Sequence, residues 1–122
     1  MITGLHHAQI TCPTGMEDEA RDFYCRVLQL EEVEKPGVLK KQGGLWLKVG
    51  DRDLHIGTED GDNPQLTKAH LAYEVTDIAF WRSRLVAEGI ALEDSVPIPG
   101  FERFEFRDPF GNRVEMIMSV GK

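Results

Sequence analysis

The feature that most constrains the fold of this 122-residue chain is that its two halves carry the same order of secondary-structure signals. Each half opens with a strand of alternating apolar and polar residues, continues with an amphipathic helix and closes with three short strands. The polar segment 59–65 separates the halves. A unit that occurs twice indicates a duplicated module, because a solenoid needs three or more copies. We therefore predict a single α+β domain, 1–122, in which two tandem β-α-β-β-β modules, about 1–59 and 66–122, form a curved mixed sheet with a concave cup.

Strand patterns in the first half lie at 5–12, 31–34, 45–49 and 53–58. Thr14 and Glu17 have the spacing of a capping box, in which two side chains satisfy the first backbone N–H groups of a helix. The helix predicted after them has one apolar stripe, formed by Ala20, Phe23, Tyr24, Val27 and Leu28. Gly50 and Asp51 predict a tight hairpin between the last two strands.

The second half repeats this pattern with strands at 69–75, 91–94, 101–107 and 113–119. Its helix is predicted to begin at Thr76 or Asp77 and to end at Gly89, because glycine takes the left-handed conformation at low cost. The side chains that this helix is predicted to bury are Ile78, Trp81, Leu85 and Val86. The turn 108–112 reverses the chain and sets the register of the final strand.

Charge and composition argue against several classes of function. A formal net charge of −7, a pI near 5.0 and scattered Lys and Arg residues do not suit a nucleic-acid partner, which requires a basic face. No apolar run approaches the roughly 20 residues that span a bilayer, and the first residues lack a signal-peptide pattern. Cys12 and Cys25 are too few for a disulfide scaffold and indicate reduced thiols. We therefore expect a cytoplasmic protein with neither a nucleic-acid nor a membrane partner.

The repeat also pairs side chains that can bind metal ions. His7 and His70 are 63 positions apart (70 − 7), each on the opening strand of its module. His55 and Glu115 are 60 positions apart (115 − 55), each on the closing strand. Apolar residues flank both His55 and Glu115, so we expect these neighbours to turn toward the helices and the polar side chains to turn away. If the modules pair about a pseudo-twofold axis, all four side chains converge on the concave face of the sheet.

Three imidazoles and one carboxylate suit Zn²⁺, Ni²⁺, Fe²⁺, Co²⁺ or Mn²⁺ better than Ca²⁺ or Mg²⁺, which prefer oxygen ligands. Two donor sets stay open. If His7, His70 and Glu115 bind alone, they leave positions free for Fe(II) oxygen chemistry or for a bidentate substrate on a Lewis acid. If His55 joins them, water or substrate completes the shell. Otherwise His55 supports the ligands by hydrogen bonding or contacts substrate.

Further side chains on the same faces are candidates for substrate contact. Arg103 either clamps a carboxylate or phosphonate through two hydrogen bonds or forms an exposed salt bridge on its strand. The other candidate cup residues are Gln9, Thr11 and Trp46. The candidate catalytic residues are Glu115 and His55, either of which is able to move a proton once it is released from the metal.

Several motifs carry a family resemblance. They are His7-x-x-Ile10, the helix 18–30 with Phe23-Tyr24 and Leu28-x-Leu30, His70-Leu-Ala-Tyr-Glu-Val-x-Asp77, and Asp108-Pro-Phe-Gly-Asn-Arg-Val-Glu115. Together they resemble the vicinal oxygen chelate superfamily, which includes glyoxalase I, extradiol dioxygenases, fosfomycin-resistance enzymes and bleomycin-resistance proteins. The turn before Glu115 is the most specific of these motifs.

The resemblance covers nearly the whole chain and implies paired β-α-β-β-β modules, one divalent metal in the cup, and a homodimer. The ligands of the family match His7, His70 and Glu115. Glyoxalase I usually has a glutamate where this chain has His55, and this departure weakens an assignment as a lactoylglutathione lyase. Gln29 stands where the family usually has glycine, which costs about 1 kcal/mol if that position is left-handed.

The resemblance therefore implies a metal-dependent enzyme that acts on a small oxygen-bearing substrate. The expected reaction types are glyoxalase-like lyase or isomerase chemistry, then ring-cleaving dioxygenation, then epoxide opening on an antibiotic. One alternative is a metal-free protein that sequesters a drug, as bleomycin-resistance proteins do. Another is a regulatory module without activity, which would fit a cup filled by bulky side chains.

Overall fold

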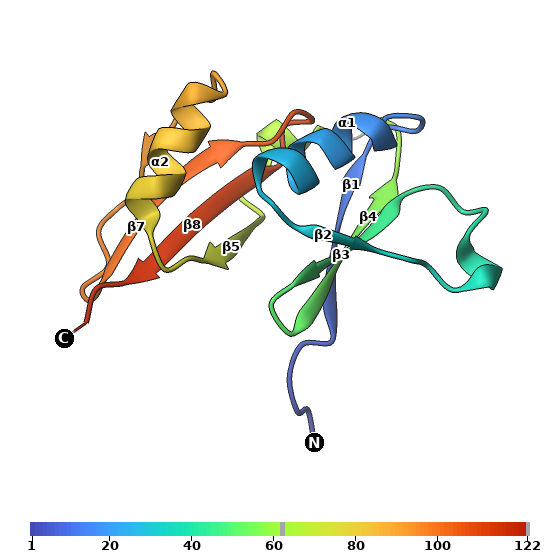
Figure 1. Cartoon of the computed structure of the whole chain (residues 1–122), viewed down its shortest axis with the longest axis horizontal. Helices are drawn as coiled ribbons and strands as arrows, with labels where there is room; N and C mark the ends of the chain where they lie inside the picture. Colours follow the sequence, from blue (N-terminus) through green and yellow to red (C-terminus); the bar gives the residue numbers. More distant parts are fainter. Residues whose placement is uncertain (62, 122) are drawn as a thin grey trace. The chain divides into compact units, whose positions relative to one another are not determined.

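The computed structural model of the protein describes residues 1–61 and 63–121. The chain divides into two compact units, 1–62 and 63–122, and the boundary falls within the predicted linker 59–65. Residue 62 of that linker and residue 122 of the predicted second module lie outside the described residues. Each unit contains a four-stranded mixed sheet and helical segments, so the predicted α+β fold of two β-α-β-β-β modules is confirmed (Figure 1).

The sheet of the first module has the strand order β1-β4-β3-β2. Its strands are β1 (His7–Cys12), β2 (Glu31–Val33), β3 (Leu45–Val49) and β4 (Arg52–Thr58). Strands β1 and β4 are parallel, and the other two pairs are antiparallel. Val49 pairs with Arg52, which leaves Gly50 and Asp51 as the predicted two-residue hairpin loop. Gly50 has a φ of 58°, as such a loop requires.

The helical part of the first module changes its geometry along its length. Helix α1 (Glu17–Arg21) continues directly as a π-helical segment, η1 (Asp22–Val27). Gln29 follows with a φ of 63°, the left-handed conformation considered above. The helical segments bury most of the predicted apolar stripe, and a short 3₁₀ segment, η2 (Gly37–Leu39), lies between β2 and β3.

The predicted capping box of Thr14 and Glu17 is wrong. Met16 occupies the position before the helix, and no side-chain hydrogen bond caps that end. A capping box needs its glutamate at the third helical position, whereas Glu17 is the first, too early for its side chain to reach back. Its carboxylate instead accepts a hydrogen bond from the backbone N–H of Gly44, at 2.9 Å, and so connects the helix to the loop before β3.

The sheet of the second module has the strand order β5-β8-β7-β6, the counterpart of the first. Its strands are β5 (His70–Glu74), β6 (Glu93–Asp94), β7 (Phe101–Arg107) and β8 (Arg113–Ser119). Strand β5 is parallel to β8, and the other two pairs are antiparallel. A 3₁₀ segment, η3 (Pro64–Leu66), precedes β5.

Helix α2 (Ile78–Ala87) begins one residue after the predicted start at Thr76 or Asp77 and ends just before Gly89, as predicted. The Asp77 side chain accepts a hydrogen bond from the N–H of Phe80 at 3.1 Å, which caps the first turn. Gly89 has a φ of 80° and closes the helix, with the following N–H donating back to the Leu85 carbonyl. Ile78 and Leu85 are buried and Trp81 is half-buried, but the predicted burial of Val86 is wrong, because its side chain lies on the exposed face of the helix.

Each module buries the apolar face of its own sheet together with its helix. The apolar strand residues of the two cores are Leu45, Leu47, Leu54 and Ile56 in the first module and Phe104, Phe106, Val114 and Met116 in the second. Because side chains alternate along a strand, the residues between these point to the opposite face of each sheet. The candidate ligands His55 and Glu115 are on that opposite face.

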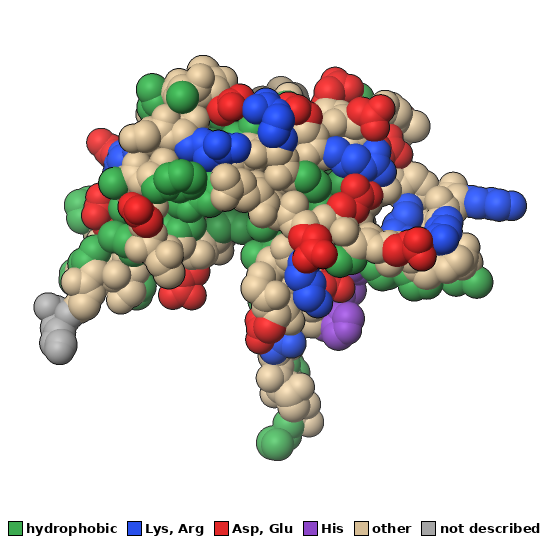
Figure 2. All heavy atoms as spheres, viewed as in Figure 1, with side chains coloured by type: hydrophobic (Ala, Val, Ile, Leu, Met, Phe, Trp, Pro, Cys, Tyr) green, Lys and Arg blue, Asp and Glu red, His purple; other side chains and the backbone are tan. Residues whose placement is uncertain are grey.

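The surface of the chain carries charges of both signs. On the face shown in Figure 2, acidic and basic side chains are interspersed rather than gathered into a basic patch. None of the helices within residues 1–61 and 63–121 has the length and apolar character needed to cross a membrane. The surface shown therefore gives no sign of the basic face that a nucleic-acid partner requires.

Candidate metal-binding site

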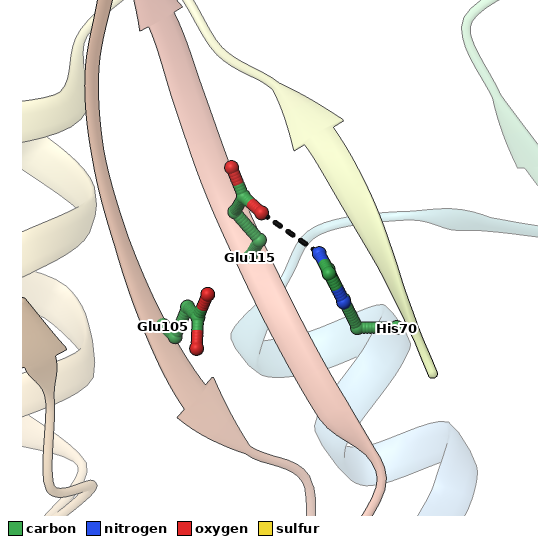
Figure 3. Close-up of side chains that lie close together, drawn as sticks. All are labelled: His70, Glu105 and Glu115. Carbon is green, nitrogen blue, oxygen red and sulfur yellow. Dashed lines mark hydrogen bonds and ion pairs between the residues drawn. The ribbon is translucent and has the colours of Figure 1, made fainter. Parts of the chain in front are cut away.

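Three ligand-type side chains lie close together on the sheet of the second module. They are His70 on β5, Glu105 on β7 and Glu115 on β8, and one ligand atom from each lies within 4.8 Å of the others (Figure 3). Strand β8 pairs with both β5 and β7, and Glu105 is directly opposite Glu115 in the β7–β8 ladder. The turn 108–112 fixes that register, because the Asp108 carboxylate accepts hydrogen bonds from two backbone N–H groups within it.

The His70 ring is held between a backbone carbonyl and a carboxylate. Its Nδ1 lies 2.9 Å from the carbonyl oxygen of Lys68, and its Nε2 lies 2.9 Å from Oε1 of Glu115. A carbonyl oxygen only accepts hydrogen bonds, so Nδ1 carries a proton and Nε2 is the nitrogen that faces the carboxylate. A histidine that binds a metal through one nitrogen characteristically donates from the other in this way.

The spacing of this pair fits a metal ion. Two ligand atoms that are each about 2.0–2.1 Å from an ion, and at the right angle of an octahedral site, are about 2.9 Å apart, which is also an ordinary hydrogen-bond distance. Nε2 of His70 and Oε1 of Glu115 have that separation. The Glu115 side chain is only 5% exposed, whereas that of His70 is 30% exposed. The pair is thus sheltered on the glutamate side and open to solvent on the histidine side.

Glu105 is already bound by an arginine. Its two carboxylate oxygens accept hydrogen bonds from Nε and a terminal nitrogen of Arg113, at 2.7 and 2.6 Å, in a bidentate fork. These hydrogen bonds hold the pKa of Glu105 below its usual value, although its burial acts in the opposite direction. Arginine thus occupies both oxygens of Glu105, whereas Oε1 of Glu115 faces His70, which is itself a candidate ligand, so Glu105 is the weaker candidate.

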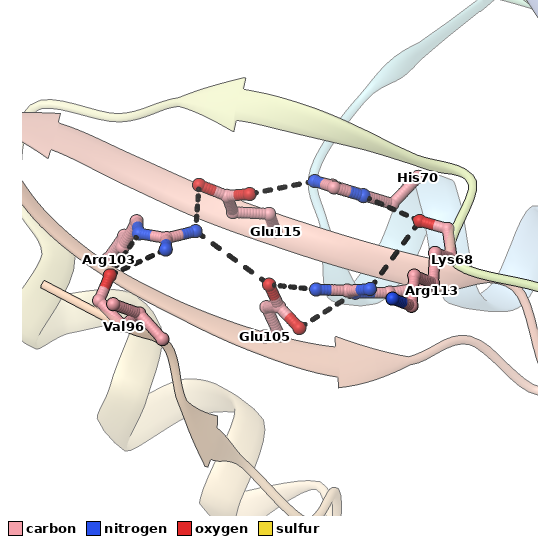
Figure 4. A network of polar contacts seen from close by, with 7 residues as sticks. All are labelled: Lys68, His70, Val96, Arg103, Glu105, Arg113 and Glu115. Atoms are coloured by element: carbon pink, nitrogen blue, oxygen red, sulfur yellow. Dashed lines mark hydrogen bonds and ion pairs between the residues drawn. The ribbon is translucent and has the colours of Figure 1, made fainter. Parts of the chain in front are cut away.

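Arg103 contacts the other oxygen of Glu115. Its Nη1 lies 3.2 Å from Oε2 of Glu115 and 3.8 Å from Oε2 of Glu105. Its Nε and Nη2 donate to the carbonyl oxygen of Val96 (Figure 4). The Arg103 side chain is only 15% exposed, so it is a mostly buried salt-bridge residue rather than an exposed one.

The first module brings His7, His55 and Trp46 together as a column of stacked rings. The ring centroids of Trp46 and His55 are 4.0 Å apart with planes 3° from parallel, and those of His55 and His7 are 4.1 Å apart at 23°. Burial lowers the pKa of His55, and the adjacent His7 lowers it further. Both effects favour the neutral form of His55, in which one ring nitrogen keeps a lone pair that can bind a metal.

A pocket of about 670 Å³ lies over this column. Its lining residues include His7, Gln9, Trp46 and His55, but Thr11 is not among those found within the described part of the chain. The Gln9 amide lies against Gly57, where an added Cβ would come within 2.9 Å of its Nε2. The absence of a side chain at Gly57 therefore makes room for Gln9 on this face. A pocket of this volume is large enough for a small organic substrate.

The predicted site residues thus form two groups, each within one module. One group joins His70, Glu115 and Arg103, and the other joins His7 and His55 with Trp46 and Gln9. Sequence reasoning missed Glu105 as a member of the first group. Its signal was present, because Glu105 is on the same face of its strand as Arg103, and a hairpin through 108–112 places it opposite Glu115.

Comparisons with known proteins agree on one family. Residues 4–116 match the family model described as the Glyoxalase/Bleomycin resistance protein/Dioxygenase superfamily. A comparison with curated protein sequences gave no match.

Among solved structures, a protein from Bacillus anthracis described as belonging to the glyoxalase family is 41% identical, with a TM-score of 0.91 over 98% of this chain and 97% of the other. A lactoylglutathione lyase from Agrobacterium tumefaciens is 24% identical, with a TM-score of 0.73 over 96% and 94%. The fosfomycin resistance protein FosX from Listeria monocytogenes, solved with Mn(II) and sulfate, is 16% identical, with a TM-score of 0.78 over 98% and 93%. The last two show a shared fold.

Proposed function

The chain belongs to the Glyoxalase/Bleomycin resistance protein/Dioxygenase superfamily, and on this basis we propose that it is a metal-dependent enzyme of the glyoxalase type. Its reaction would be a lyase or isomerase step on a small oxygen-bearing substrate that chelates a divalent metal. The observation that carries this proposal is the cluster of His70, Glu105 and Glu115, whose ligand atoms lie within 4.8 Å of one another. Two proteins that share this fold are described as a lactoylglutathione lyase and as FosX in complex with Mn(II), which makes lyase chemistry and a divalent metal the first to test.

In this proposal His70 and Glu115 supply two ligands from the second module, and His7 and His55 supply the others from the first. Imidazole and carboxylate donors suit Zn²⁺, Ni²⁺, Fe²⁺, Co²⁺ or Mn²⁺. When bound, such an ion supplies a Lewis acid that stabilises negative charge on a substrate oxygen. Glu115 or His55 would carry the proton between positions on the substrate.

The remaining proposed roles concern substrate and assembly. Gln9 and Thr11 of β1 and Arg103 of β7 are proposed to contact the substrate, and Gln9 already lines the pocket of the first module. We also propose a cytoplasmic homodimer, as the family resemblance implies. Light scattering during gel filtration measures the mass of the assembly and would contradict the dimer if it gave a single 13.8 kDa chain.

The first experiment is elemental analysis of protein purified without chelators. We expect about one transition metal ion per chain in the wild type, and its loss in His70→Gln and in Glu115→Gln. Glu102→Gln is the matched control, because Glu102 is an exposed glutamate on β7 that lies outside the cluster. Loaded protein should then be assayed on 2-oxoaldehyde–thiol adducts and on catechols, which separate glyoxalase-like from dioxygenase chemistry.

A second candidate function is a metal-free binding protein of the bleomycin-resistance kind. The observation in its favour is that side chains of this chain, Arg103 and His70, contact both oxygens of Glu115. The acidic net charge of −7 would suit a cationic ligand. Absence of bound metal, even after incubation with each candidate ion, would favour this function over the enzyme.

A further inference from the structure

Arg103 holds one specific oxygen of Glu115. The two oxygens of the Glu115 carboxylate have different partners. Oε1 lies 2.9 Å from His70 Nε2, and Oε2 lies 3.2 Å from Arg103 Nη1 (Figure 4). Both side chains of the Glu115–Arg103 pair are mostly buried, at 5% and 15% exposure. In such surroundings a charged contact is screened less than on the surface and fixes side-chain orientation more firmly.

Arg103 is itself anchored from two sides. The Val96 carbonyl accepts hydrogen bonds from its Nε and Nη2, and the Nε bond is 3.0 Å long. Glu105, fixed by the bidentate fork from Arg113, lies 3.8 Å from its Nη1 and provides a counter-charge. Each of the three guanidinium nitrogens therefore has a contact within the second module. The Val96 carbonyl occupies the side of the guanidinium formed by Nε and Nη2, so a bidentate clamp on a substrate carboxylate through that side would have to break these bonds.

We propose that Arg103 is a positioning residue which, by holding Oε2 of Glu115, presents Oε1 alone beside His70 Nε2. Glu115 then binds an ion through one oxygen rather than two. One-oxygen binding leaves an additional coordination position open, as a substrate that chelates through two adjacent oxygens requires. Only this metal-related part of the inference rests on the proposed function, because the contact that orients Glu115 is made between two side chains of this chain.

The test compares Arg103→Met and Arg103→Lys with the wild type. Arg103→Met keeps a long side chain but removes every hydrogen bond, and Arg103→Lys keeps the charge without the planar fork. Arg82→Met is the matched control, because Arg82 is in the same module and forms an ion pair with Asp94. Backbone NMR spectra and thermal unfolding show which variants fold, and Arg103→Lys serves for the test if Arg103→Met does not.

The metal-free measurement is the ring ¹⁵N spectrum of His70 in protein labelled at histidine, assigned with His70→Gln. In the wild type and in Arg82→Met we expect the same Nε2 chemical shift, set by the neighbouring Oε1 of Glu115. In Arg103→Met the Nε2 signal should shift, because Oε1 is no longer held in place, with a smaller effect in Arg103→Lys. Unchanged His70 signals in both Arg103 variants would overturn the positioning role.

The second measurement is titration with Mn²⁺ by calorimetry and by electron paramagnetic resonance. We expect about a tenfold or greater loss of Mn²⁺ affinity and an altered Mn²⁺ spectrum in Arg103→Met, in the range typical of residues that orient a metal ligand. Unchanged affinity and spectrum would overturn the metal-related part. If the wild type bound no Mn²⁺ or any other candidate ion, the proposed function would fail, while the His70 signals would still decide whether Arg103 orients Glu115.

Discussion

At the scale of single residues, the backbone at Gln29 is the clearest local strain. Its φ of 63° is left-handed, and it is the only such non-glycine residue among those described. Leu30 donates its N–H to the Tyr24 carbonyl at 3.0 Å, six residues back, which is one residue more than in the bond that closes α2 around Gly89. A side chain at this position therefore meets steric resistance that glycine would avoid.

We predict that Gln29→Gly stabilises the protein by about 0.5–1 kcal/mol, because the relief of strain exceeds the extra entropy that glycine brings to the unfolded chain. Urea unfolding followed by circular dichroism measures the difference. Glu102→Gly, an exposed strand position without left-handed φ, should destabilise the protein instead. A loss of stability in Gln29→Gly would contradict the account of strain.

A second prediction at this scale concerns the pKa of His55, which lies in the stack of rings between His7 and Trp46. Burial lowers its pKa from the usual 6.5, His7 lowers it further and Asp53 raises it. In metal-free protein the NMR midpoint of His55 should therefore lie below 6.5. It should rise in His7→Gln, which removes a like charge, and fall in Asp53→Asn, which removes an opposite one. Movement of the midpoint in the same direction in both variants would contradict this arrangement of charges.

At the scale of elements, the contact between Glu17 and Gly44 joins α1 to the loop before β3. The hydrogen bond from the Gly44 N–H lowers the pKa of Glu17 below its usual 4.5. A carboxyl group with a lowered pKa in the folded state stabilises the fold above its unfolded pKa, and that stabilisation is lost as the pH falls through the folded value.

We therefore predict that Glu17→Gln costs about 1 kcal/mol at pH 7 and that its difference from the wild type shrinks below about pH 4. Chemical unfolding at a series of pH values measures both quantities. Glu19→Gln is the control, since Glu19 is an exposed acidic residue on the same short helix. A constant difference across the pH range would show that the charge on Glu17 is not what stabilises the loop.

The bounds of an element were predictable from the sequence where local residue patterns determine them. Features that depend on contacts with distant parts of the chain were not. Strands β7 and β8 have the predicted bounds, because alternating burial and the turn 108–112 specify them locally. The start of α1 differs from prediction because Glu17 has a better partner in Gly44, 27 positions away, than in its own helix. Val86 is exposed because the core of the second module covers only part of α2.

The same distinction holds for the candidate site. The repeat predicted ligand-type side chains at matching positions of the two halves, and the structure brings His70 beside Glu115 and His7 beside His55. That these four bind one ion stays a prediction. The contacts of the two Glu115 oxygens with His70 and Arg103 could not be predicted, because they depend on the directions of side chains on three strands. The stacking of His55 on Trp46 depends in the same way on the pairing of β3 with β4.

At the scale of the whole molecule, the candidate ligands are divided between two modules, with His7 in one and Glu115 in the other. A double-mutant cycle tests our proposal that both bind the same ion. If they do, the effects of His7→Gln and Glu115→Gln on Zn²⁺ affinity are coupled. Effects at independent sites add within about 0.3–0.5 kcal/mol, whereas ligands of one ion should deviate by about 1 kcal/mol or more. Competition with a chromogenic chelator measures the Zn²⁺ affinity of each variant.

The number of Zn²⁺ ions bound per chain gives a second test of the same proposal. A centre shared by both modules binds one ion, whereas a separate site in each module would bind two. We expect about one Zn²⁺ per chain in the wild type and substoichiometric loading in either single variant. Asp51→Asn, an exposed position in the β3–β4 hairpin, should leave both stoichiometry and affinity unchanged. Two ions per wild-type chain, each lost with only one of the two substitutions, would mean that each module binds its own metal. The proposal of a single chelating centre would then fail, although both modules would keep their folds.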